Sequence, residues 1–150
     1  MTNLYAPSKA KGEKVAFNKV MFSSASDHWA TPKDVYMALD KEFCFQDDPC
    51  PIGGGGGLER EWGSPSFVNP PYSEISKWIR YGYEQSQAGK VVVFLIPSRT
   101  DTRWWHDYVM KAKEIRFIKG RLKFGGSKNS APFPSAIVVF GERREGGKEV

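Results

Sequence analysis

The sequence predicts an α/β fold built on a mixed sheet whose C-terminal strands are antiparallel. A continuous apolar run over residues 91–96, rich in β-branched side chains, is typical of a strand buried on both faces. Apolar residues at helical spacing stand before and after that run, as they do where helices connect the strands of a sheet. Residues 115–118, 121–124 and 136–140 are further strand candidates with no helix between them, so this end of the sheet is expected to be antiparallel.

Bulk composition fits a single folded domain. The chain has 150 residues, and 40% hydrophobic and 14% aromatic content suffices for a core, which excludes a disordered chain. A net charge of +5 suits a polyanionic partner such as nucleic acid, although charge alone is a weak signal. Two cysteines and two histidines support neither a disulfide framework nor a zinc site, so no metal is expected. No apolar run suits a membrane span or a signal peptide, which favours a reducing cytoplasm.

Three regions follow one another along the chain. Residues 1–22 are polar and basic and are interpreted as a flexible arm, residues 23–141 as the folded domain, and residues 142–150 as a polar tail. Five consecutive glycines at 53–57 lack the Gly-Lys-Ser/Thr ending of a phosphate-binding loop, so they are interpreted as a flexible connector.

The first half of the domain contains two expected helices. Thr31 as N-cap and Pro32 at the first helical position open the first helix, and a short strand is expected over residues 43–48, ending in acidic residues. Residues 66–68 form an apolar strand, after which Ser73 is expected to cap the second helix. One face of that helix carries Ile75, Trp78, Ile79 and Tyr83.

A third helix is expected over residues 101–113. Trp104, Trp105 and Tyr108 recur there at helical spacing, and core packing is the favoured interpretation of both tryptophans.

The tetrapeptide Asn69-Pro70-Pro71-Tyr72 is the most specific feature for chemistry. An aromatic amine is a poor nucleophile, because its lone pair is delocalised into the ring. The amide oxygen of Asn69 and the carbonyl of Pro70 can accept hydrogen bonds from its two N–H groups and direct the lone pair at a methyl donor. The two prolines hold the backbone extended, and Tyr72 offers a face for an extruded base. The position after a strand is where open α/β sheets bind ligands, whereas a plain turn is the alternative.

Six ordered blocks resemble the phage-type DNA N6-adenine methyltransferases, also called phage Dam proteins. These blocks cover roughly residues 27–140. They are Asp27-His28-Trp29-Ala30-Thr31-Pro32, Asp48-Pro49-Cys50, Phe67-Val68-Asn69-Pro70-Pro71-Tyr72-Ser73, Pro97-Ser98-Arg99-Thr100-Asp101-Thr102 with Trp104-Trp105, Gly120-Arg121-Leu122-Lys123-Phe124, and Pro132-Phe133-Pro134-Ser135-Ala136.

The resemblance implies a compact, abbreviated Rossmann-like fold that binds S-adenosyl-L-methionine. It implies that the block from Trp29 to Pro32 closes over the methionine part of the cofactor and that Asp48 pairs with its ammonium group. The residues implied in cofactor binding are Trp29, Thr31, Pro32, Asp48, Pro49, Cys50 and Asn69, and those implied in catalysis are Asn69, Pro70, Pro71 and Tyr72. A glycine-rich cofactor loop is not recognisable near Asp48, and the segment after it is short, so contacts to the adenosine are expected to be few.

Basic and hydroxyl side chains that suit DNA phosphates follow the strand expected over residues 91–96 and surround the Gly125-Gly126 loop. The candidates are Arg99, Thr100, Arg103, Arg121, Lys123 and Lys128. For the residues around Arg99, helix capping by Thr100 or Asp101 is an equally supported interpretation. For Arg121, Lys123 and Lys128, a solvated hairpin edge is an equally supported one.

The resulting functional hypothesis is transfer of a methyl group to N6 of adenine in DNA, in the host cytoplasm if the gene belongs to a phage. A non-catalytic DNA-binding decoy of the same fold is one alternative. Methylation of another amide or amine, such as cytosine N4 or protein glutamine, is a second. The sequence leaves the recognition site and the oligomeric state open.

Overall fold

A computed structural model describes residues 28–52, 56–126 and 128–142. The basic arm expected over residues 1–22 and nearly all of the polar tail lie outside this range. The chain divides into two compact units, one of residues 1–29 with 71–73 and the other of residues 30–70 with 74–150. The second unit contains the sheet, and it is described first.

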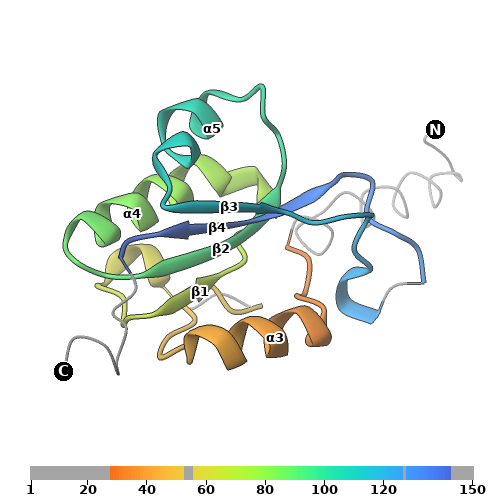
Figure 1. Cartoon of the computed structure of the whole chain (residues 1–150), viewed down its shortest axis with the longest axis horizontal. Helices are drawn as coiled ribbons and strands as arrows, with labels where there is room; N and C mark the ends of the chain where they lie inside the picture. The colour runs from red at the N-terminus through yellow and green to blue at the C-terminus, as the bar shows by residue number, and fades with distance from the viewer. Residues whose placement is uncertain (1–27, 53–55, 127, 143–150) are drawn as a thin grey trace, which may run out of the picture. The chain divides into compact units, whose positions relative to one another are not determined.

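The sheet has four strands in the order β1-β2-β4-β3 (Figure 1). These are β1 (Ser66–Val68), β2 (Val92–Pro97), β3 (Glu114–Phe117) and β4 (Ser135–Phe140). β1 and β2 are parallel, whereas β4 is antiparallel to both of its neighbours, β2 and β3. The mixed α/β sheet with an antiparallel C-terminal end is therefore confirmed.

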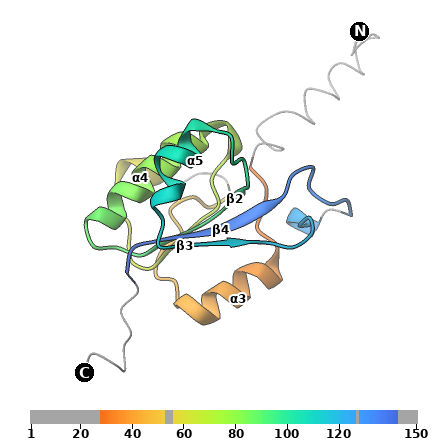
Figure 2. The ribbon, with the colours of Figure 1, turned by 45° about the horizontal axis from the view of Figure 1, so that its top comes forward.

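Helices cover both faces of the sheet. α3 (Lys33–Phe43) lies on one face, and α4 (Ile75–Gln87) and α5 (Arg103–Asp107) lie on the other (Figures 1 and 2). Short 3-10 helices complete the described elements: η1 (Gly57–Glu59), η2 (Tyr72–Glu74), η3 (Val109–Lys111) and η4 (Phe124–Gly126). No helix in the described ranges is both long and apolar enough to cross a lipid bilayer.

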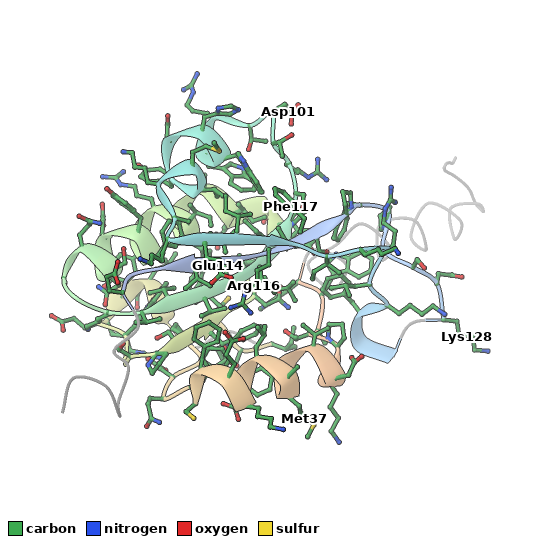
Figure 3. The ribbon with its side chains drawn as sticks, viewed as in Figure 1. Met37, Asp101, Glu114, Arg116, Phe117 and Lys128 are labelled. Carbon is green, nitrogen blue, oxygen red and sulfur yellow. The ribbon has the colours of Figure 1, made fainter. Side chains whose placement is uncertain are left out.

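The core follows from the two central strands. Every residue of β2 and β4 is buried, as the β-branched runs predict for strands covered on both faces. Phe94 of β2 meets Phe140 of β4 edge to face at 5.9 Å, and Trp62 packs on Phe94 and Trp78. On the opposite face, Arg116 of β3 forms two hydrogen bonds of 2.7 and 2.6 Å with Glu42 of α3 (Figure 3). That pair joins α3 to the edge of the sheet.

Both expected helix caps in the first half are wrong. α3 has Pro32 as its N-cap residue, and proline has no side-chain acceptor for a cap bond, while the hydroxyl of Thr31 accepts a hydrogen bond from Asn69. α4 begins at Ile75 after the η2 turn, so Glu74 rather than Ser73 stands at its N-cap. The expected buried face is largely confirmed, since Ile75, Trp78 and Ile79 are buried and Tyr83 is half-buried.

Two expected strands are also wrong. Residues 43–48 begin as the last turn of α3, and a single parallel bridge joins Asp47 to Ser66. Residues 121–124 form no strand, because the chain there curls into η4 and Phe124 packs on Phe133 at 5.9 Å. The side chains that suggested a strand serve this small local core instead.

The helix expected over residues 101–113 is shorter and interrupted. α5 ends at Asp107, and Tyr108, at φ −125° and ψ −50°, separates it from η3. Thr102 is the N-cap, and its hydroxyl accepts from Trp105 N at 3.2 Å, so neither Thr100 nor Asp101 has the capping role considered above. Trp105 is core at 2% exposure, but Trp104 is half-buried.

The glycine run contains a packed residue. Gly57 is buried, and its carbonyl accepts a 2.7 Å hydrogen bond from Trp62 Nε1. A Cβ at Gly57 would lie 2.9 Å from both the Pro49 carbonyl carbon and the Trp78 ring, so only glycine fits. The interpretation as a plain connector is therefore wrong for Gly57, while residues 53–55 lie outside the described range.

Candidate active site

Asn69 is the residue that directly follows β1, at the end where the parallel strands β1 and β2 finish. Its side chain is buried, with 4% exposure, and its amide Nδ2 donates to Thr31 Oγ1 at 2.9 Å. Thr31 lies two residues before α3, 38 positions away in the sequence. Asn69 is therefore buried and held by a distant segment, unlike an ordinary exposed turn residue.

The Thr31 hydrogen bond determines how the Asn69 amide is rotated. Because Nδ2 faces the hydroxyl, the amide oxygen lies on the other side of the group. Pro70, the next residue, is also buried, and its ring limits φ to the extended region that continues out of β1. The contact with Thr31 thus helps to orient the amide oxygen that the proposed amine chemistry needs as an acceptor.

The small unit contains the aromatic end of the motif. The rings of Trp29 and Tyr72 are stacked, with centroids 6.4 Å apart and an interplanar angle of 21°. Both side chains are half-buried. Trp29, expected at the methionine part of the cofactor, therefore has an aromatic partner inside the Asn69–Tyr72 tetrapeptide.

Of the two consecutive acids at the end of the 43–48 segment, Asp47 has a structural role. Its carboxylate accepts from Arg60 at 2.7 and 3.0 Å and from Gly63 N at 2.7 Å. These hydrogen bonds, led by that of Arg60, lower the pKa of Asp47. Asp48, the next residue, is exposed to solvent.

Cys50 is buried in an acidic setting. Burial, followed by the charges of Asp48 and Glu74, raises the pKa of the Cys50 thiol to about 12. The thiol is therefore neutral and acts as a small apolar group against the backbone. Pro49, its neighbour, is buried as well and contacts the Gly57 backbone.

The loop after β3 borders the Thr31 segment. Gly125, with φ 57°, donates from its backbone N to Ala30 O at 2.9 Å. Further along, Ser98 N donates to Pro134 O at 2.9 Å, which joins the end of β2 to the start of β4. The loop that carries Arg121, Lys123 and Lys128 thus contacts the residue next to Thr31.

The basic candidates divide into two groups. Arg99, Thr100 and Arg103 are exposed around the start of α5, and Arg121, Lys123 and Lys128 are exposed on the later loop. Figure 3 shows Lys128 projecting from a different part of the unit than Asp101, which stands among the first group. Arg121 makes a long hydrogen bond of 3.4 Å to Ala131 O, so part of its donor capacity serves the loop itself.

Sequence reasoning missed the contact between Thr31 and Asn69, because a hydroxyl before a helix is interpreted locally as a cap. The contact becomes visible only in the structure, where the two side chains lie 2.9 Å apart.

Within the described part of the chain, no group of three or more His, Cys, Asp or Glu side chains could hold a metal ion.

Comparison with known proteins covers the part of the candidate site from residue 55 onwards. The family model described as DNA N-6-adenine-methyltransferase (Dam) matches residues 55–144, three fifths of the chain, and this range includes Asn69 and all four strands. A protein of Escherichia phage T1 named DNA N-6-adenine-methyltransferase is 26% identical over 117 residues. That match covers 64% of this chain and 46% of the relative, so the chain spans about half the length of the curated relative. Given the extent of the family match, the chain belongs to the DNA N-6-adenine-methyltransferase (Dam) family.

Proposed function

We propose that this protein methylates N6 of adenine in DNA, with S-adenosyl-L-methionine as the methyl donor. The observation that carries the proposal is Asn69, buried after β1 with its amide rotation fixed by Thr31, in a chain of the Dam family. Family membership supplies the reaction class, and the asparagine supplies the acceptor that an exocyclic amine needs.

The motif residues have separate roles in this proposal. The Asn69 amide oxygen and the Pro70 carbonyl accept hydrogen bonds from the two N–H groups of the adenine amine. These bonds direct the nitrogen lone pair toward the methyl donor. Tyr72 provides a ring against which the extruded base stacks, as expected for enzymes that modify a base outside the helix. Because Trp29 is stacked on Tyr72, it supports that ring or exchanges places with the base.

The residues around Asp48 fit the amino-acid end of the donor. An exposed carboxylate beyond the sheet edge suits an ammonium group, which makes Asp48 the candidate. When bound, the donor supplies an electrophilic methyl group. Thr31 and Pro32, which precede α3, and Pro49 and Cys50, which are buried beside Asp48, shape this side of the proposed site.

The exposed basic groups near both loops suit the DNA backbone. Arg99, Thr100 and Arg103 would hold phosphates near the end of β2, and Arg121, Lys123 and Lys128 would reach a second stretch of backbone. A Rossmann-like arrangement of the cofactor half belongs to the same proposal, supported by the parallel pair β1 and β2 with helices on both faces of the sheet.

Incubation of the full chain with tritiated S-adenosyl-L-methionine and unmethylated DNA, followed by nucleoside analysis, tests the proposal. Label in N6-methyladenine is the expected result, and Asn69→Ala should lower the rate by at least about 100-fold while the folded state is retained. Gln87→Ala, which removes an exposed amide at the end of α4, is the matched control.

Other outcomes identify the competing functions. Label in N4-methylcytosine or in protein glutamine would change the proposed substrate and retain the proposed transfer of a methyl group to an amine or amide nitrogen. Absence of donor binding by calorimetry, together with DNA binding, would establish the decoy. A folded Asn69→Ala protein with the wild-type rate would refute the role of the asparagine.

A further inference from the structure

A cavity of about 550 Å³ lies between α4 and α5, outside the motif described above. Its lining includes Lys77 and Arg80 of α4, Arg103, Trp104 and Asp107 of α5, and Tyr108. The volume is in the range that accommodates a small organic ligand. Of these residues, only Arg103 was a candidate from the sequence.

The position of the cavity follows from the topology. α4 follows β1 through the catalytic tetrapeptide, and α5 follows β2, which is the parallel neighbour of β1. Both helices therefore begin at the end of the sheet where β1 and β2 finish and where Asn69 lies. Lys77 is the third residue of α4, and Arg103 and Trp104 are the first two of α5, so the cavity lies beside that edge.

The charge of the lining favours an anion. Three cationic side chains face one carboxylate, that of Asp107. Lys77 is 3.9 Å from Glu74 and Arg80 is 3.1 Å from Glu84, but the two cationic side chains are 68% and 67% exposed. Ion pairs at such exposure contribute little, so a phosphate can compete for these cations.

Trp104 gives the cavity an aromatic surface. Its neighbour Trp105 is buried in the core and anchors the helix, whereas Trp104 is half-buried and lines the cavity. The two rings are tilted by 54° with centroids 6.0 Å apart, so the Trp104 ring is not stacked on Trp105. Cations beside an aromatic face are the combination that binds a nucleotide of a single strand.

We propose that the α4–α5 cavity binds one unpaired nucleotide of the DNA strand, with its phosphate at Lys77, Arg80 and Arg103 and its base against Trp104. This inference rests on DNA as the substrate and adds a second contact beside the adenine site. It also gives a reason for the exposure of Trp104, which helix periodicity alone assigns to the core.

Fluorescence anisotropy with a short labelled single-stranded DNA tests the phosphate half of the inference. The double variant Lys77→Gln/Arg80→Gln should bind about tenfold more weakly and lower the slope of log K against log salt by at most about 0.7, because the cavity holds one phosphate and each neutralised phosphate of a single strand contributes about 0.7. Lys33→Gln/Lys41→Gln removes two exposed charges from α3, on the opposite face, and is the matched control. Equal losses in the two double variants would overturn the inference.

An abasic deoxyribose-phosphate oligomer tests the base half. Trp104→Leu should weaken binding of the normal strand about tenfold and leave binding of the abasic strand unchanged, whereas Trp104→Phe should retain most of the affinity. Wild-type affinity of Trp104→Leu for the normal strand would overturn the stacking contact. If the wild-type chain binds neither strand nor methylates DNA, the proposed function fails; if it methylates DNA while the cavity variants match the control, only this inference fails.

Discussion

At the scale of single residues, the Thr31–Asn69 hydrogen bond links the two ends of the candidate site. Each partner has an ordinary local interpretation, a cap for Thr31 and a turn residue for Asn69. In the structure the hydroxyl serves the amide, and α3 begins without a side-chain cap. The start of α3 therefore lacks a side-chain cap, which typically contributes about 1 kcal/mol, and the Thr31 hydroxyl instead holds the Asn69 amide.

Thr31→Val should lower kcat for methylation about tenfold with a smaller change in the KM for DNA. The lost hydrogen bond allows the Asn69 amide to rotate, which misplaces its oxygen for the transition state more than for the bound substrate. Thr31→Ser keeps the hydroxyl and should restore kcat. Steady-state kinetics on the three proteins check this, and a loss that Ser does not rescue would assign Thr31 a packing role only.

Cys50 gives a second residue-scale prediction, with a pH dependence. The thiol pKa is about 12 in the folded chain against about 9 for an ordinary cysteine. Between those values the unfolded chain releases the proton and the folded chain keeps it, so the free energy of unfolding should fall as pH rises above about 9. The slope from this thiol is at most about 1.4 kcal/mol per pH unit.

Urea unfolding at several pH values above 8, for the wild type and Cys50→Ala, isolates that slope. A shallower pH dependence is expected in the variant. Thiol labelling supplies an independent check, because exposed Cys44 should react in the native protein and buried Cys50 only on unfolding. Native reaction of both thiols at equal rates would contradict the burial of Cys50.

At the scale of elements, α4 shows how helix packing can reverse an intrinsic preference. Alanine is normally a better helix former than glycine by about 1 kcal/mol. At Gly82, however, an added Cβ would lie 2.5 Å from Phe94 Cε2 and 3.3 Å from Trp62. The glycine lets α4 approach β2 closely, which helps determine where the helix and its cavity-lining side chains lie.

Gly82→Ala should therefore destabilise the protein by about 1–3 kcal/mol, despite the better helix propensity. Chemical denaturation measures the change, and Gln87→Ala at the exposed end of the same helix is the control. The double variant Gly82→Ala/Phe94→Leu should recover part of the loss, because the smaller side chain relieves the overlap. A Gly82→Ala protein as stable as the wild type would show that α4 can shift away from the sheet.

At the scale of the whole molecule, the exposed basic candidates of the sheet-containing unit lie in two places that the topology separates. The segments around Asp101 and around Lys128 project from different parts of the sheet-containing unit (Figure 3). Basic groups so separated act independently if both meet the same DNA, since distant sites are additive.

Neutralising each group should lower DNA affinity by its own amount. Arg99→Gln/Arg103→Gln and Lys123→Gln/Lys128→Gln should each weaken duplex binding and reduce the salt slope by about two. The combined variant should show the sum of the two changes in log K, with Lys33→Gln/Lys41→Gln as the control for total charge. If the Lys123/Lys128 pair matches that control, this loop edge is solvated and DNA lies over the start of α5 alone.

The sequence by itself determined the elements whose signal is local and strong. The apolar runs predicted β2, β3 and β4, and the motif after β1 identified Asn69, because burial and strand propensity act over a few neighbouring residues. Tertiary structure decided the rest. Residues 121–124 form a turn in which Phe124 packs on Phe133 instead of the expected strand, and Asp47 forms an ion pair with Arg60. Tertiary structure also turned Thr31 from a cap into a partner of Asn69, since a hydroxyl bonds whichever donor the fold brings to it.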